Sequence, residues 1–162
     1  MPASSQSELL HEIAQFLYRA ARYEDEHRYE DWESLWTDDG VYWVPANGEN
    51  IDPEKQMSII YDNRSRIGLR VRQLLTGKRH TQEPQSRLRR LISNIELLAE
   101  DRNGLRVGAN VIVFETNQRG DTLWCARLEY VLRRVDGALR IAYKKVALVN
   151  GEKAIPTLSF LI

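Results

Sequence analysis

Histidine and cysteine are the side chains that most often ligate metals, and this sequence holds few of them. The 162 residues include three histidines, His11, His27 and His80, and one cysteine, Cys125. Because His11 and His27 fall on or just beyond one expected helix, their side chains point about 160° apart around its axis and cannot share an ion. One cysteine excludes an intrachain disulfide, a four-cysteine iron–sulfur cluster and a Rieske centre. We therefore expect this chain to hold no metal and no cofactor.

Motifs for nucleophilic catalysis and for nucleotide binding are also absent. The sequence contains no G-x-S-x-G, no G-x-G-x-x-G and no phosphate-binding P-loop. General acid–base chemistry at the mouth of a cavity stays open, because tyrosine, aspartate and histidine can all transfer protons. The candidates are Tyr23, Asp38, Tyr42 and His80. Each also has an ordinary structural role: the tyrosines as core aromatics, Asp38 in a turn, and His80 in a polar loop.

Charge is unevenly distributed although the formal net charge is zero. The segment 24–54 holds eleven acidic residues and one basic residue, whereas 64–90 holds nine basic residues and one acidic residue. Such asymmetry fits a surface that binds nucleic acid, and it also fits two oppositely charged segments that pair with each other or with another subunit. We favour pairing of the charged segments, because the sequence contains no nucleic-acid-binding motif. Arg87 and Arg89 should share one face of a strand, with Arg90 on the other. Together with Trp124 and the apolar segment 156–162, these arginines indicate either a subunit surface or a solvated basic face.

The elements that must position these side chains begin with helices. Apolar residues at helical spacing predict a helix over about 7–26, and a second, short one fits 29–36. Asp38-Asp39-Gly40 indicates a turn, 41–44 a strand, and 46–56 a loop, while 57–61 is ambiguous. Asp62 is placed to cap a helix over 63–75 that ends at Thr76-Gly77.

Strands dominate the rest of the chain. Four segments have β character, namely 87–99, 105–117, 122–135 and 138–149, and they are joined by short turns containing glycine. Four strands linked in this way form an antiparallel meander. Helices followed by a long antiparallel sheet give an α+β fold, and a curved sheet wrapped around the first helix makes a cone that can enclose a cavity.

Length and composition indicate one globular domain over residues 1–162, with 43% hydrophobic and 28% charged residues. No apolar run is long enough to cross a membrane, and the first residues do not resemble a signal peptide. We expect a soluble cytoplasmic protein that binds neither membrane nor nucleic acid.

Seven segments, spread over nearly the whole chain, form a further pattern: 16–25 (FLYRAARYED), 29–35 (YEDWESL), 41–45 (VYWVP), 60–64 (IYDNR), 69–77 (LRVRQLLTG), 86–95 (SRLRRLISNI) and 156–162. In this order they resemble the small (β) subunit of aromatic-ring-hydroxylating dioxygenases, most closely those of the benzoate-type branch. No single one of these motifs is diagnostic, but together they are fairly specific.

This resemblance implies a cone-shaped fold of the nuclear-transport-factor-like superfamily and a structural, non-catalytic role. It implies a partner α subunit that carries a Rieske [2Fe–2S] cluster and a mononuclear iron. It also implies a hexamer of three α and three β subunits, built on a β trimer. A reductase or ferredoxin would deliver electrons to this complex. The assembled enzyme would add O₂ to an aromatic ring to give a cis-dihydrodiol. From the resemblance and the arginine cluster, we expect the subunit contact surface to include Tyr61, Arg64, Arg72, Arg87, Arg89, Arg90 and Asn94.

The alternative hypothesis is a stand-alone dehydratase or isomerase of the same cone fold. It would use Tyr23, Asp38, Tyr42 and His80 around the interior cavity. The two hypotheses differ in what they require of the interior, since only the stand-alone enzyme needs these side chains to share one pocket.

Overall fold

The computed structural model describes residues 3–46, 52, 54, 58–76, 85–149 and 160–162. The chain starts with α1 (Ala3–Asp25) and the short α2 (Tyr29–Glu33). α1 buries Ile13, Phe16 and Leu17 on one side, as its helical spacing predicts. The second helix is shorter than predicted, because Ser34 caps it and Trp36 pairs with Ile141 as the first residue of a strand.

That strand is β1 (Trp36–Pro45), and it pairs with β2 (Ser58–Asp62). The prediction of a turn at Asp38-Asp39-Gly40 is wrong, since these residues lie within β1 at an irregularity in its pairing with β6. Glycine is required at position 40, because a Cβ there would approach the Trp36 ring to 2.7 Å. The segment 57–61, which the sequence leaves ambiguous, is a strand from Ser58 onward, since β2 covers these residues.

α3 (Arg64–Leu75) follows directly, and its N-cap is Asn63 and not Asp62. The Asn63 side chain accepts a hydrogen bond from the Arg66 backbone N–H at 3.0 Å, as a helix cap does. Asp62 instead pairs with Arg70 at 2.7 Å.

The expected antiparallel meander is confirmed by β3 (Arg87–Asp101), β4 (Gly104–Asn117), β5 (Gly120–Val135) and β6 (Ala138–Leu148). The turn between β5 and β6 has positive φ at both Asp136 (52°) and Gly137 (84°), which matches the twist of adjacent strands. The strands form one sheet in the order β2-β1-β6-β5-β4-β3, in which only the β1–β6 pair is parallel.

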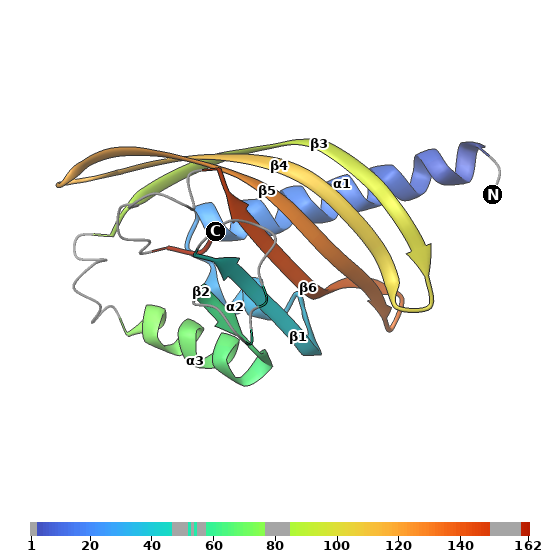
Figure 1. Cartoon of the computed structure of the whole chain (residues 1–162), viewed down its shortest axis with the longest axis horizontal. Coiled ribbons are helices and arrows are strands. Elements are labelled where there is room, and N and C mark those ends of the chain that lie inside the picture. The colour runs from blue at the N-terminus through green and yellow to red at the C-terminus, as the bar shows by residue number, and fades with distance from the viewer. Residues whose placement is uncertain (1–2, 47–51, 53, 55–57, 77–84, 150–159) are drawn as a thin grey trace.

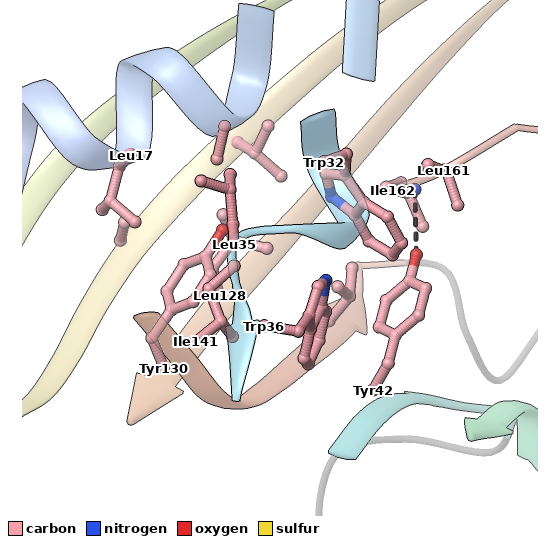
Figure 2. Close-up of a cluster of buried hydrophobic side chains, with 14 of the residues drawn as sticks. Leu17, Trp32, Leu35, Trp36, Tyr42, Leu128, Tyr130, Ile141, Leu161 and Ile162 are labelled. Atoms are coloured by element: carbon pink, nitrogen blue, oxygen red, sulfur yellow. Dashed lines mark hydrogen bonds between the residues drawn. The ribbon is translucent and has the colours of Figure 1, made fainter. Parts of the chain in front are cut away.

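The sheet curves over α1, and α2 and α3 lie beyond the end of that helix (Figure 1). Trp32, Trp36 and Tyr42 pack with tilted or edge-to-face rings at centroid distances of 5.4–5.8 Å. Leu161 and Ile162 lie beside this aromatic group (Figure 2) and are almost completely buried. The predicted α+β cone is confirmed. Among the described residues, no helix is both long and apolar enough to span a lipid bilayer.

Candidate functional site

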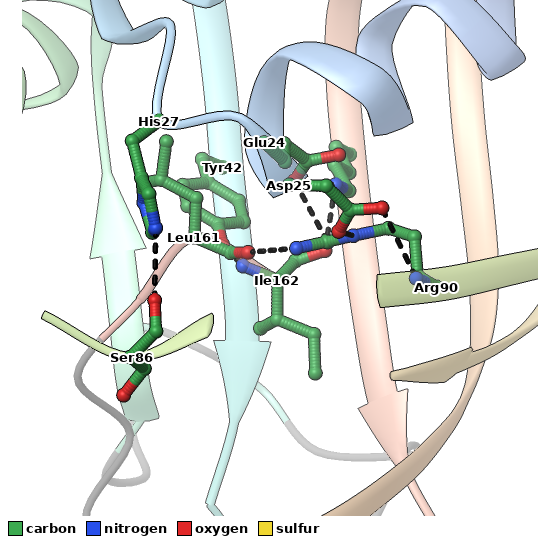
Figure 3. A network of polar contacts seen from close by, with 9 residues as sticks. Glu24, Asp25, His27, Tyr42, Ser86, Arg90, Leu161 and Ile162 are labelled. Atoms are coloured by element: carbon green, nitrogen blue, oxygen red, sulfur yellow. Dashed lines mark hydrogen bonds and ion pairs between the residues drawn. The ribbon is translucent and has the colours of Figure 1, made fainter. Parts of the chain in front are cut away.

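A cluster of buried charged side chains lies inside the cone, and Figure 3 shows Glu24, Asp25 and Arg90 of this cluster. Glu24 and Asp25 come from the last turn of α1, Arg90 from β3 and Lys144 from β6. Arg90 Nε donates to Asp25 at 2.7 Å, and its Nη1 lies 3.4 Å from Glu24. Lys144 Nζ donates to the same Glu24 oxygen at 3.1 Å. Two cations thus face two carboxylates, which is the balance that buried charges require.

The last described segment of the chain enters this cluster. Arg90 Nη2 donates to the Leu161 carbonyl at 3.1 Å, and Lys144 Nζ donates to the backbone oxygen of Ile162 at 2.7 Å. The Ile162 backbone N–H donates to the Tyr42 hydroxyl at 3.0 Å. The charged cluster therefore binds the backbone of residues 161–162, and the aromatic core surrounds their side chains (Figures 2 and 3).

Burial governs the electrostatics of this cluster. It lowers the pKa of Lys144, and the positive charge of Arg90 adds to that effect, against the opposing influence of Glu24. Burial also opposes the charged form of Arg90, but Glu24 and Asp25 outweigh it, so that the pKa of Arg90 is raised. The pKa of Tyr42 is raised by burial and by Glu24, which keeps its hydroxyl protonated.

A second polar network joins the end of α1 to the start of β3. His27 Nε2 contacts the Ser86 carbonyl at 2.9 Å, and the Tyr29 hydroxyl lies 3.0 Å from its Nδ1. Since a carbonyl only accepts, Nε2 carries a proton, and in the neutral form of the ring Nδ1 accepts from the Tyr29 hydroxyl. The Ser86 hydroxyl in turn donates to the buried Glu115 at 2.6 Å, and Trp124 Nε1 donates to the same carboxylate at 3.0 Å.

The residues proposed for a stand-alone enzyme do not meet in one pocket. Tyr42 is completely buried with its hydroxyl on Ile162, whereas Asp38 is exposed on β1. Tyr23 is half-buried beneath the Arg28 guanidinium, and His80 lies outside the described residues. Two grooves of about 610 and 400 Å³ lie along α1, but they are lined by other residues, among them Glu8, Glu12, Arg134 and Leu139.

The residues proposed for a contact surface separate into two groups. Tyr61, Arg64 and Arg72 lie on β2 and α3, and Arg87, Arg89 and Asn94 lie on β3, at the opposite end of the strand order. Arg64 pairs with Glu33 at 2.8 Å, and the Tyr61 hydroxyl donates to Glu54 at 3.0 Å.

Arg90 does not belong on a contact surface, because its side chain is 1% exposed and bound within the chain. The expectation that Trp124 and the segment 156–162 face a partner is corrected for Trp124 and residues 160–162, while residues 156–159 lie outside the described residues. Trp124 is 2% exposed, and Phe160 packs against it with ring centroids 5.6 Å apart.

An apolar surface that sequence reasoning missed lies on the outer face of β3, β4 and β5. We call it the outer-face patch, and it consists of Leu91, Ile112, Phe114 and Leu123, which are 67%, 43%, 45% and 61% exposed. Leu91 lies opposite Ile112, and Phe114 lies opposite Leu123, so the four side chains are cross-strand neighbours. Arg89 lies opposite Phe114 and borders the patch. The signal in the sequence was the unbroken apolar run 111–114, which is apolar on both faces of its strand.

Among the described residues, no group of three or more His, Cys, Asp or Glu side chains is arranged to hold a metal ion. The charged cluster binds a segment of the chain inside the cone, and the outer-face patch leaves apolar side chains exposed on its outside.

Comparison with known proteins connects this arrangement to a family. Residues 19–152 match the family model described as "Ring hydroxylating beta subunit". The chain is 30% identical over 136 residues to the small oxygenase component of the p-cumate 2,3-dioxygenase system of Pseudomonas putida, an alignment that covers 83% of this chain and 76% of that protein. It is 37% identical over 93 residues to the toluate 1,2-dioxygenase β subunit of the same organism, covering 54% of this chain and 57% of that subunit.

A solved structure shares the fold. The β subunit of the benzoate 1,2-dioxygenase of Burkholderia mallei superposes with a TM-score of 0.72 at 25% identity, covering 85% of this chain and 89% of that one. The cone described above is thus the nuclear-transport-factor-like fold found in such subunits.

Proposed function

The chain belongs to the family of ring-hydroxylating dioxygenase β subunits, and from that premise we propose that it is the structural, non-catalytic subunit of a multicomponent enzyme that dihydroxylates an aromatic ring. The observation that carries this proposal is the family match, which extends from within α1 to beyond β6. Relatives are named for p-cumate, toluate and benzoate, all of which are aromatic carboxylates. Aromatic acids are therefore the first substrates to test with the assembled enzyme.

The chemistry of the complex would reside in its partner. We propose an α subunit that holds a Rieske [2Fe–2S] cluster and a mononuclear iron, with electrons supplied from NAD(P)H through a reductase or ferredoxin. One O₂, two electrons and two protons added to the ring give the cis-dihydrodiol. We further propose three α and three β subunits in the complex, with the β subunits in contact as a trimer, working in the cytoplasm.

We assign the α-subunit contact to the outer-face patch and the arginines beside it. Leu91, Phe114 and Leu123 are large apolar side chains that are 67%, 45% and 61% exposed in the isolated chain. Full burial of an exposed side chain of this kind is worth about 1.5–3 kcal/mol, and covering the exposed half of each gives about half of that, so the patch is suited to lie at the centre of a contact. Arg87 and Arg89 are exposed on the same face of β3 and suit a polar rim.

Co-purification with the α subunit from the same genome tests this assignment. We expect the variant Arg89→Glu with Leu123→Asp to lose the α subunit while its circular dichroism and unfolding temperature stay close to those of the unaltered chain. The matched control is Arg22→Glu with Leu10→Asp, which makes the same kinds of change at exposed positions of α1. Retention of the α subunit by the outer-face variant would refute this contact, and so would an equal loss from the control.

The second group of residues is tested separately. Arg72→Glu and Tyr61→Ala alter the exposed side of α3 and of β2 without touching the outer-face patch. If these variants lose the α subunit or the β trimer while the outer-face variant keeps both, the contact surface lies at the β2 end of the sheet and not at the β3 end.

A further inference from the structure

Residues 160–162 occupy the interior of the cone as a bound ligand would. Phe160, Leu161 and Ile162 are 5%, 2% and 1% exposed. Phe160 lies edge-on against Trp124, and Leu161 and Ile162 lie beside Trp32 and Tyr42 (Figure 2). Their side chains are thus enclosed by α2, β1 and β5, which are elements far from them in sequence.

Recognition of this segment also involves its backbone. Arg90 and Lys144 each donate to one backbone oxygen, and Tyr42 accepts from one N–H. These three contacts bind the polar groups of the segment's backbone and leave its side chains to the apolar wall, as in known modes of peptide recognition.

The polar groups that bind the segment are held by other contacts. Asp25 fixes Arg90 twice, through its backbone N–H at 3.1 Å and its Nε at 2.7 Å. Glu24 faces both Arg90 and Lys144. Arg90 and Lys144 are therefore positioned from α1, independently of the segment that they bind, which is the preorganisation expected of a binding site.

We propose that the interior of the cone is a binding site for an apolar peptide segment, and that the chain's own residues 160–162 occupy it. The ligand class is a short peptide with bulky apolar side chains that presents two backbone oxygens to Arg90 and Lys144 and one N–H to Tyr42. Because the segment is covalently attached, its effective concentration at the site is high, and a free peptide of the same chemistry is excluded from the unaltered chain. This site is separate from the proposed α-subunit contact, which lies on the outer face.

Peptide binding to a full-length variant with a weakened internal segment tests the proposal. Leu161→Ser with Ile162→Ser removes apolar contacts while retaining all 162 residues. We expect a fluorescein-labelled peptide ending in Phe-Leu-Ile to bind this variant saturably, as measured by fluorescence polarisation, and to bind the unaltered chain at least 100-fold more weakly. A matched peptide with an N-methylated isoleucine lacks the N–H that Tyr42 accepts and should bind about tenfold more weakly than the first peptide.

Changing the site itself provides the second arm. Tyr42→Phe in the weakened variant removes the acceptor for that N–H, so it should abolish the difference between the two peptides. If the weakened variant does not fold alone, the same titration is followed by near-ultraviolet circular dichroism, and recovery of a native spectrum at saturating peptide supports the proposal. Absence of both binding and recovery, or equal binding of the N-methylated peptide to the Tyr42 form, overturns it.

Discussion

The inner and outer faces of β3, β4 and β5 come from the same strands, but their side chains differ in whether they contact other parts of the chain or solvent. On the inner side of the sheet, the charged and apolar side chains contact other groups of the same chain, including the backbone oxygens of residues 161–162. On the outer face, Leu91 and Leu123 stay more than half exposed. Apolar patches of this kind mark contact surfaces.

This difference separates two roles that a subunit must combine. The inner face uses its charges to complete the fold, so altering it should cost stability. The outer face contributes little to the folded state of the isolated chain, so altering it should cost association. Each of the following predictions contrasts the two faces or tests where one ends.

The largest effect is expected at neighbouring arginines of β3. Arg90→Met leaves Glu24 and Asp25 buried without the cation that faces them both, and we expect a loss of about 3–5 kcal/mol in the free energy of unfolding. Arg89→Met, one position away and exposed, should change it by less than about 0.5 kcal/mol. Urea unfolding of both variants measures the contrast, and equal losses would contradict the assignment of the two faces.

Two leucines of β5 give the same contrast without charge. Leu128 is 1% exposed, so Leu128→Ala should cost about 2–5 kcal/mol through lost contacts and the cavity that remains. Leu123 is 61% exposed, and Leu123→Ala should leave the unfolding free energy of the isolated chain within about 0.5 kcal/mol while weakening binding of the α subunit. Thermal unfolding measures the change in stability, and a quantitative pull-down measures the change in affinity for the α subunit. An unchanged affinity for the α subunit would remove Leu123 from the contact.

The parts of the fold that could be predicted depend on patterns between residues that are close in sequence. The glycine-containing turns and the alternation of apolar residues determine the meander, and both are signals within a few residues. The alternation even placed Arg89 and Arg90 on opposite faces of β3 correctly. Family resemblance then supplied the fold and the role that the comparisons confirm.

Non-local contacts account for what was missed. Which of the two arginines faces inward depends on Asp25, which is 65 positions away from Arg90, and no pattern near Arg90 carries that information. The apolar segment at 160–162 was assigned to a surface because its partners, Trp124 and Tyr42, are distant in sequence. The predicted turn at Asp38-Asp39-Gly40 failed because these residues form an irregularity inside β1, between the paired residues Trp36 and Val41, and do not end the strand.

The third prediction concerns the pH dependence of stability, and it tests the polar network that joins the end of α1 to the start of β3. Burial lowers the pKa of His27 below its ordinary value of 6.5, with Arg90 adding to that effect and the Ser86 carbonyl and Asp25 opposing it. Between the lowered pKa and 6.5, the unfolded chain binds more protons than the folded chain. Stability is therefore complete above pH 6.5 and falls as the pH drops through that window, by no more than about 1.4 kcal/mol per pH unit for one group.

His27→Asn removes this titration and suits the backbone, since asparagine tolerates the φ of 56° at this position. We expect the difference in unfolding free energy between the unaltered chain and the variant to shrink as the pH is lowered from 7.5 to 5.5. Parallel pH profiles would show that His27 is equally solvated in the folded and unfolded chains.

The smallest effect is expected at Asn94, which sequence reasoning placed on the contact surface. Its φ is 55°, at an irregularity in the pairing of β3 with β4, and this left-handed conformation by itself explains an asparagine. We expect Asn94→Gly to leave stability and α-subunit affinity unchanged, and Asn94→Ala to cost about 1 kcal/mol of unfolding free energy because alanine is strained there. If Asn94→Gly instead weakens α-subunit binding at unchanged stability, the amide itself touches the partner, and the contact on the outer face extends from the patch to this position.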